Sequence, residues 1–242
     1  MKLTHGLAAA ALSLTALAAH AEITGTVSAV SDYNFRGVSL SANDPALQGS
    51  LDYAHESGFY AGAWASNIDY GDDYDGNIEI DLYAGFAGEF SEGFGYDVGL
   101  VWYTYPDSSG DAFDQTSEIK NYPEIYAGLT YNWLEVKQWY TNDYGGLDLD
   151  AFYTEANATY ELPANFGLTA HVGYSYGDAF EDSEFIDYTV GVTYTLGHFD
   201  LGLVYADTDL SESDWAYSDD DVFKTTGRAI FSVSTAFPWS AE

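Results

Sequence analysis

The side chains in this sequence that are best suited to acid–base or nucleophilic chemistry are few. Histidine is the usual general base near neutral pH, and three histidines lie beyond the first 21 residues: His55, His171 and His198. None has a Ser or Cys partner in a recognisable motif, and the chain contains no Cys. We therefore expect no catalytic residues and no enzyme. A hydrolase site assembled from separate segments around His171 remains as a second alternative.

A metal site is the next chemistry that the residue types suggest. Residues 69–76 carry four Asp, and clustered carboxylates suit a hard cation such as Ca²⁺. The EF-hand spacing fails, because placing Gly76 at the sixth position puts Gly71 at the first and Leu82 at the twelfth, where carboxylates are required. The acidic run at residues 219–221 has no ligand spacing either. We interpret both as solvated loops and predict no metal or cofactor, with weak divalent bridging between loops left open.

Most other carboxylates lie in segments in which polar and apolar residues alternate. In residues 185–196, Ile186 and Val190 belong to an apolar row, whereas Asp187 and Thr189 belong to a row of small or polar residues. A period of two predicts a strand with two unlike faces. After the Gly-His turn at 197–198 the alternation resumes, which indicates a β-hairpin.

Twelve segments share this alternation. They are residues 22–30, 46–55, 59–67, 77–90, 94–105, 122–131, 133–140, 151–161, 166–176, 185–196, 199–207 and 228–237. Tight turns follow every even-numbered segment, and long polar loops follow the odd-numbered ones. An even strand number places both ends of the strand array on the short-turn side, as in outer-membrane barrels that fold from the periplasm.

The first 21 residues predict export. Lys2 precedes an apolar core, and Ala19-His20-Ala21 is a small-x-small cleavage site, so we expect a signal peptide over residues 1–21 with cleavage between Ala21 and Glu22. Removing these residues, which carry one Lys and no acid, would change the formal charge from −33 to −34. Such a chain lacks the Lys and Arg needed to neutralise phosphates, which excludes nucleic acid as a partner. Its 17% aromatic content argues against disorder.

Barrel size decides which face of the strands points outward. Only about eight strands enclose an interior that side chains can fill, so a twelve-stranded barrel with an apolar interior would leave a void. We therefore predict an all-β fold: an antiparallel up-and-down transmembrane barrel over residues 22–242, with apolar rows such as that of Val98 and Leu100 facing lipid. A soluble β-sandwich with an aromatic core is the alternative fold. Aromatic residues near strand ends are expected at headgroup level, and they are Tyr60, Trp64, Trp102, Tyr105, Tyr131, Trp133, Trp139 and Tyr140.

The opposite rows should then line a lumen with an excess of negative charge. The candidate pore-lining acids are Asp52, Glu79, Asp81, Asp97, Glu124, Glu135, Glu155, Asp187 and Asp200. Only Lys137 and Arg228 are permanent cations on the same rows. Rings of carboxylates favour cations in a pore. Pairing or protonation of these acids in a plugged lumen remains open.

Arg36 is a further pore-lining candidate, because it lies where the first strand passes into the first long loop. If it folds inward, it faces acids, either as a constriction residue that sets selectivity or as an anchor that ties the loop to inward carboxylates. A buried charge is normally paired, which favours the anchor.

Two stretches resemble a known family. Residues 31–70, SDYNFRGVSLSANDPALQGSLDYAHESGFYAGAWASNIDY, contain S-D-Y-x-F-R-G and D-P-A-x-Q-G elements. They resemble the N-terminal signature of the TorF family, a conserved proteobacterial β-barrel family regarded as outer-membrane porins. Residues 155–174, EANATYELPANFGLTAHVGY, are similar to that family's later strand pair. Family members end at or near an aromatic residue, whereas five residues follow Phe237 here.

The sequence and the resemblance together predict a porin-like channel for passive diffusion of small solutes, with a preference for cations, in the outer membrane of a Gram-negative bacterium. The expected partners are outer-membrane lipid, small solutes or ions, and the barrel-insertion machinery. The alternative function is a structural or adhesive surface barrel without an open pore. The solute and the oligomeric state are left open.

Overall fold

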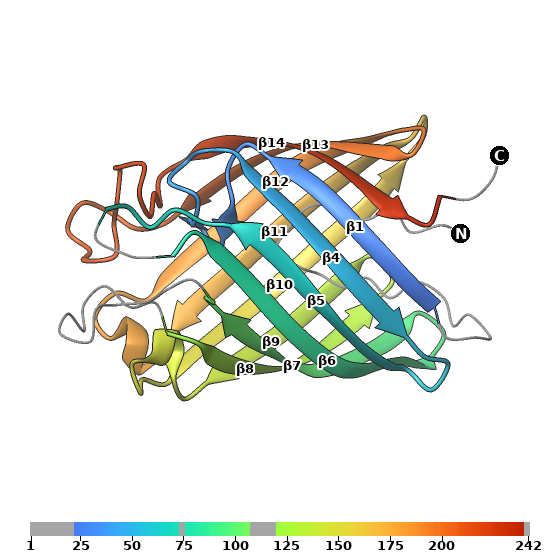
Figure 1. Ribbon diagram of the computed structural model, residues 1–242, viewed down its shortest axis with the longest axis horizontal. Coiled ribbons are helices and arrows are strands. Elements are labelled where there is room, and N and C mark those ends of the chain that lie inside the picture. The colour runs from blue at the N-terminus through green and yellow to red at the C-terminus, as the bar shows by residue number, and fades with distance from the viewer. Residues whose placement is uncertain (1–21, 73–75, 107–119, 240–242) are drawn as a thin grey trace.

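Twelve long strands form a closed antiparallel ring in a computed structural model that describes residues 22–72, 76–106 and 120–239 (Figure 1). The predicted all-β barrel and its twelve strands are confirmed. The ring strands are β1 (Glu22–Val30), β4 (Ala46–Ala54), β5 (Phe59–Asn67), β6 (Ile78–Ser91), β7 (Phe94–Thr104), β8 (Tyr122–Tyr131), β9 (Leu134–Thr141), β10 (Ala151–Leu162), β11 (Phe166–Tyr176), β12 (Phe185–Leu196), β13 (Phe199–Thr208) and β14 (Arg228–Phe237).

The ring closes between its first and last strands. β1 pairs with β4 on one side and with β14 on the other, with Val30 opposite Ser232 and Gly25 opposite Phe237. Closure leaves no strand edge, so each ring strand has a hydrogen-bonded neighbour on both sides. This arrangement satisfies the strand backbone without water, which hydrocarbon requires.

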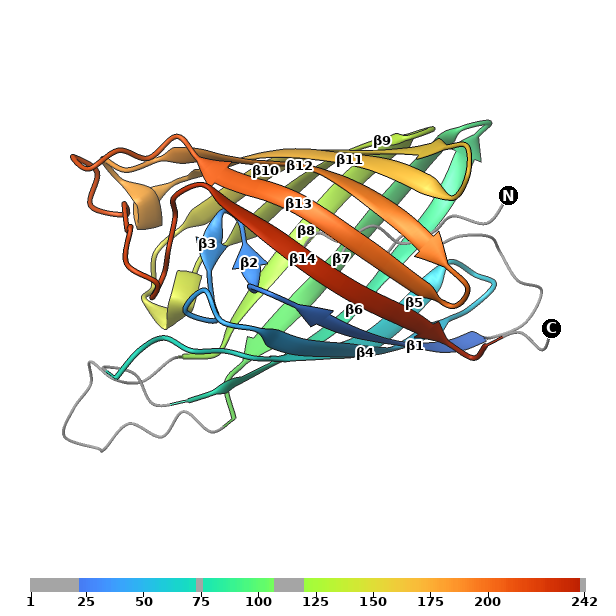
Figure 2. The same cartoon turned by 90° about the horizontal axis from the view of Figure 1, so that it is seen from above.

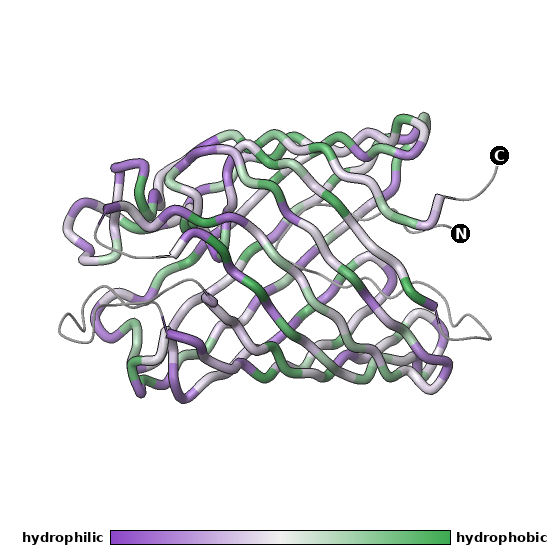
Figure 3. Tube along the Cα trace, in the orientation of Figure 1, coloured by the Kyte–Doolittle hydropathy of each residue, from purple (hydrophilic) through white to green (hydrophobic). Residues whose placement is uncertain are grey.

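The two faces of the ring differ as the alternation predicts. The outward side chains of Leu100, Leu129 and Val190 are 46%, 61% and 59% exposed, whereas the inward side chains of Glu124 and Asp187 are almost completely buried. Figure 3 shows hydrophobic and hydrophilic positions alternating along the strands. The outer wall is therefore an apolar belt around a polar interior.

The two rims also differ. β1 begins and β14 ends at the rim of tight turns, and the long loops gather at the other rim (Figure 1). The turn between β4 and β5 needs glycine at position 58, where φ is +88° and a Cβ would lie 2.3 Å from the backbone oxygen of Ala87. The long-loop rim carries two short 3₁₀ helices, η1 (Tyr144–Gly146) and η2 (Asp178–Phe180).

The first long loop contains an element that the strand pattern did not predict. Between β1 and β4, β2 (Asn34–Phe35) and β3 (Val38–Ser39) form a small hairpin outside the ring sheet. Figure 2 shows this hairpin within the mouth of the barrel at the long-loop rim. Two-residue strands are too short to produce a detectable periodicity.

Some sequence predictions fall outside the described residues. These are the signal peptide at residues 1–21, residues 73–75 of the acidic loop, and residues 107–119 of the loop between β7 and β8. Among the residues that the structure describes, no helix has the length and apolar character needed to span a membrane.

The opposite faces of β12 provide a first prediction. Val190 lies outward near the middle of the strand, and Thr189 lies inward next to it at nearly the same depth. Val190→Arg should lower the free energy of unfolding by about 2–4 kcal/mol, because it places a charge against hydrocarbon. Thr189→Arg should fold normally in the same lipid vesicles, as measured by urea titration. Equal losses at both positions would contradict the assignment of the faces.

Candidate functional site

The tip of the β2–β3 hairpin reaches the barrel wall. Arg36 and Gly37 form its two-residue turn with φ values of +48° and +85°, and positive φ at both central residues is the requirement of a type I′ turn. A Cβ on Gly37 would lie 2.6 Å from Cγ2 of Thr208 and 2.7 Å from Cβ of Asp187. The tip is therefore pressed against β12 and β13, and only glycine fits there.

Arg36 joins this tip to a different part of the wall. Its Nη1 and Nη2 atoms donate to Oε1 and Oε2 of Glu124 on β8 at 2.9 and 2.5 Å, a paired geometry that strengthens a guanidinium–carboxylate contact. The guanidinium carbon also lies 4.3 Å from the ring centroid of Tyr153 and 4.7 Å from that of Phe35. Both charged side chains are buried. These are the contacts of an anchor.

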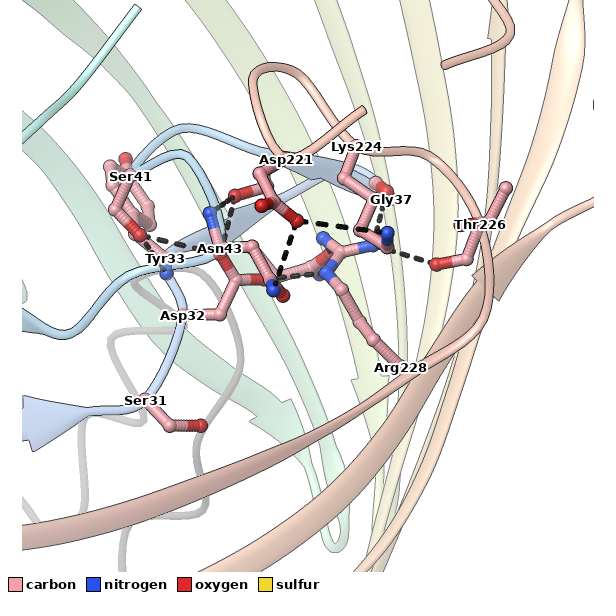
Figure 4. A network of polar contacts seen from close by, with 12 residues as sticks. Ser31, Asp32, Tyr33, Gly37, Ser41, Asn43, Asp221, Lys224, Thr226 and Arg228 are labelled. Carbon is pink, nitrogen blue, oxygen red and sulfur yellow. Dashed lines mark hydrogen bonds and ion pairs between the residues drawn. The ribbon is translucent and has the colours of Figure 1, made fainter. Parts of the chain in front are cut away.

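Arg228 on β14 contacts the same hairpin at both its base and its tip. Its Nε atom donates to Oδ2 of Asp32 at 2.5 Å, and its Nη atoms donate to the backbone oxygen of Gly37 at 3.1 Å and to Oδ1 of Asn34 at 2.6 Å (Figure 4). The Ser39 hydroxyl donates to the other oxygen of Asp32. The hairpin is therefore fixed from β8 and β14, with its tip against β12 and β13.

Lys137, the third buried cation, lies nearer the tight-turn rim. Its Nζ atom is 3.1 Å from Oδ2 of Asp97 and 3.8 Å from Oε1 of Glu135. Asp97 also accepts a hydrogen bond of 2.6 Å from the Tyr60 hydroxyl. This cluster ties β5, β7 and β9 together across the lumen side of the wall.

His171 lies in a polar cluster that joins β10, β11 and β12. Its Nε2 atom is 3.0 Å from Oδ1 of Asp187, and its Nδ1 atom is 2.6 Å from Oδ1 of Asn157. Glu155 is 3.6 Å away, and the Tyr153 hydroxyl donates to Asp187 at 2.9 Å. Among the described residues, no Ser hydroxyl contacts His171, so the arrangement lacks the nucleophile that a serine hydrolase needs.

The remaining inward acids fall into two classes. Asp52 and Asp200 are partly exposed and accept hydrogen bonds of 2.7 and 2.6 Å from Ser50 and Thr195. Glu79 and Asp81 are buried on β6, and neither forms an ion pair among the described residues. All twelve pore-lining candidates thus point to the interior, but the contacts draw only some of them together, around Arg36, Lys137, His171 and Arg228.

Sequence reasoning missed the aromatic filling of the lumen and misplaced some aromatic residues. Four of the eight residues predicted for the headgroup girdles point inward instead: Tyr60, Trp64, Tyr105 and Trp139. They pack with Tyr33 and Tyr103 into a cluster on the β5–β9 side of the interior. The alternation along β7 could have predicted this, because Tyr103 and Tyr105 belong to the same every-second-residue row as the inward Asp97. Asp32 was also missed, since it lies in an irregular loop.

The comparisons with known proteins agree with this architecture. A family model described as "Bacterial protein of unknown function (Gcw_chp)" matches residues 15–237. The chain belongs to this family. No curated protein sequence matches the Gcw_chp chain.

Solved structures resemble this Gcw_chp protein in fold. A KdgM porin has a TM-score of 0.54 at 8% identity, covering 90% of this chain and 99% of the porin. A NanC porin has a TM-score of 0.53 at 10% identity, covering 89% and 100%. A KdgM porin in complex with disordered oligogalacturonate has a TM-score of 0.53 at 9% identity, covering 90% and 99%. At these identities the likeness shows a shared barrel fold.

The contact between Arg36 and Glu124 leads us to predict that their contributions to the free energy of unfolding are strongly coupled. Arg36→Met and Glu124→Gln should each lower the free energy of unfolding by about 3–5 kcal/mol, because each leaves a buried partner uncompensated. The double variant should lose clearly less than the sum of the two losses. The measurement is urea unfolding of the barrel in lipid vesicles.

Lys224→Met provides the control for this cycle. Lys224 pairs with the exposed Asp219 and Asp221 in an outer loop, so its loss should cost about 0–1 kcal/mol. Additive losses at Arg36 and Glu124 would show that the pair does not hold the hairpin.

Proposed function

We propose that this Gcw_chp protein is an outer-membrane channel that lets small solutes diffuse passively and favours cations. The observation that carries the proposal is the closed twelve-stranded ring with an exposed apolar belt outside and charged side chains inside. Twelve strands enclose more space than side chains alone fill. An interior of this kind suits water and ions, whereas the belt suits hydrocarbon.

The charge of the interior supports the cation preference. Among the described residues, the nine predicted acids and Asp32 face it, against three permanent cations: Arg36, Lys137 and Arg228. The cations are engaged by Glu124, Asp97 and Asp32. Asp52, Glu135, Glu155 and Asp200 stay partly exposed. A permeating ion would therefore meet these four acids.

The excess negative charge of the interior also bears on which solutes can pass. Oligogalacturonate, seen with a KdgM porin of similar fold, carries a carboxylate on each sugar. An interior with excess carboxylates would repel such a polyanion, so the solute of the KdgM porin does not transfer to this chain. We propose small cations and neutral solutes instead.

One observation favours a second function, a structural or adhesive surface barrel. The hairpin fills the mouth at the long-loop rim, and the aromatic cluster covers the β5–β9 side of the interior as far as Tyr60. Arg36 and Arg228 hold the hairpin at both its tip and its base. If the hairpin and the aromatic cluster close the passage, the function would instead reside in the acidic outer loops, which would contact surfaces or other molecules outside the cell.

The proposal includes the route to the membrane. A signal peptide cleaved between Ala21 and Glu22 would export the chain, and the barrel-insertion machinery would place it among outer-membrane lipids. Membership of the TorF family is part of the same proposal, because the motifs of residues 31–70 support it.

Reversal potential in a planar bilayer tests the cation preference. Wild type under a salt gradient should pass cations more readily than anions. The triple variant Asp52→Asn, Glu135→Gln, Asp200→Asn should move the potential toward zero, with a larger shift at low salt, where screening is weaker.

Three exposed loop acids give a matched control. Glu181→Gln, Glu212→Gln and Asp220→Asn remove the same charge from the outer loops, and their effect on selectivity should be smaller. Anion preference in the wild type would contradict the proposed selectivity. Absence of conductance under every condition would favour the surface barrel.

Gly37→Ala tests whether the hairpin narrows the passage. An added methyl group would collide with Thr208 and Asp187, so the tip must leave the wall and single-channel conductance should rise. Gly145→Ala is the control, because Gly145 also has positive φ, +61°, but has no atom within 4 Å of the added carbon. Equal conductance in Gly37→Ala, Gly145→Ala and wild type would show that the hairpin does not limit flow.

A further inference from the structure

Glu79 and Asp81 form an acidic pair that the charge pattern of the interior does not explain. They lie two residues apart on β6, so both side chains point inward, and they are 1% and 8% exposed. Oε2 of Glu79 and Oδ1 of Asp81 are buried and have no hydrogen-bond partner among the described residues. Tyr105 donates to Oε1 of Glu79 at 3.3 Å. Both carboxylates thus belong to the same buried row of β6, and each has one oxygen without a hydrogen-bond partner in the described part of the chain.

No cation of the chain is available to them. Beyond residue 21 the sequence contains five Lys and Arg residues, all of them described. Each is engaged elsewhere, and they are Arg36 with Glu124, Lys120 with the backbone oxygen of Gly146, Lys137 with Asp97, Lys224 with Asp219, and Arg228 with Asp32. Glu79 and Glu124 disfavour a negative charge on Asp81, and Glu124 is already paired with Arg36.

Burial of ionised carboxylates without a counter-charge is strongly unfavourable. Something other than the chain's own cations must therefore neutralise the pair. The atoms that could act as metal ligands here are the carboxylate oxygens and the Tyr105 hydroxyl oxygen, and oxygen ligands suit a hard cation. A divalent ion would balance two negative charges at once. Ca²⁺ accepts irregular oxygen shells completed by water, whereas Mg²⁺ requires near-octahedral geometry.

We propose that Glu79 and Asp81 bind one Ca²⁺ ion inside the mouth of the barrel. No group of three or more His, Cys, Asp or Glu residues suited to a metal occurs among the described residues, so water would complete the shell around these two carboxylates. The site lies at the end of β6 that follows the loop carrying Asp69, whose backbone N–H donates to Leu40 of the hairpin loop at 2.9 Å. Bound Ca²⁺ would therefore stabilise the segment where the first two long loops meet.

Equilibrium dialysis of the folded barrel against ⁴⁵Ca²⁺ tests the site without any measurement of conductance. Wild type should bind one more Ca²⁺ per chain than the Glu79→Gln/Asp81→Asn variant. Asp52→Asn/Asp200→Asn is the matched control, because it also removes two inward acids, both of which already accept hydrogen bonds from hydroxyls. The control should bind as much Ca²⁺ as wild type.

Urea unfolding provides the second measurement. Ca²⁺ should raise the unfolding midpoint of wild type relative to a chelator, and this rise should be absent in Glu79→Gln/Asp81→Asn. Folding of each variant is checked by heat-modified gel mobility, and Asp81→Asn alone replaces the double variant if that variant does not fold. Equal Ca²⁺ binding by wild type and the variant at pH 8 would overturn the proposal and indicate that the pair retains a proton instead. Failure of the channel proposal would leave these results unchanged.

Discussion

The structure depends on the pairing of β1 with β14. Without that seam the sheet would have two open edges, and hydrocarbon offers no water to satisfy their backbone groups. With it, every ring strand is hydrogen-bonded on both sides. The alternation along each strand then separates an outer belt for lipid from an inner surface that cannot reach lipid. The inward position of Glu124 and the outward position of Val190 both follow from this one closure.

A closed ring of twelve strands creates a second constraint, because its interior must be occupied. This chain places tyrosines on the β5–β9 side and folds a hairpin into the mouth. A hairpin that carries polar groups into the interior requires partners there. Glu124 on β8 is the partner of Arg36 in the hairpin turn, and Arg228 on β14 is the partner of Asp32 at the hairpin base. Two of the five Lys and Arg residues beyond residue 21 thus hold one short element, and most interior acids are left without a permanent cation.

The sequence predicted the ring well because its signal is repeated over many residues. Residues 22–30, 59–67 and 166–176 were predicted with the bounds that β1, β5 and β11 show. The hairpin could not be predicted, since two-residue strands leave no period and its position depends on contacts with β8 and β14. Tyr60 and Tyr105 were expected at headgroup level because they lie near strand ends. They point inward instead, because the alternation along the strand, and not the distance from its end, decides which face a residue occupies. Side-chain pairing across the interior, such as Arg36 with Glu124, depends on folded geometry that alternation does not encode.

The central claim is that the interior holds water and attracts cations. Since the chain has no Cys, a single Thr193→Cys substitution on the inward row of β12 reports on the interior alone. The rates at which small thiol-specific reagents of opposite charge modify this cysteine in lipid vesicles measure access and potential together. The account predicts that both reagents react and that the cationic one reacts faster, with the difference shrinking as salt rises. No reaction with either reagent, or faster reaction with the anionic one, would contradict it.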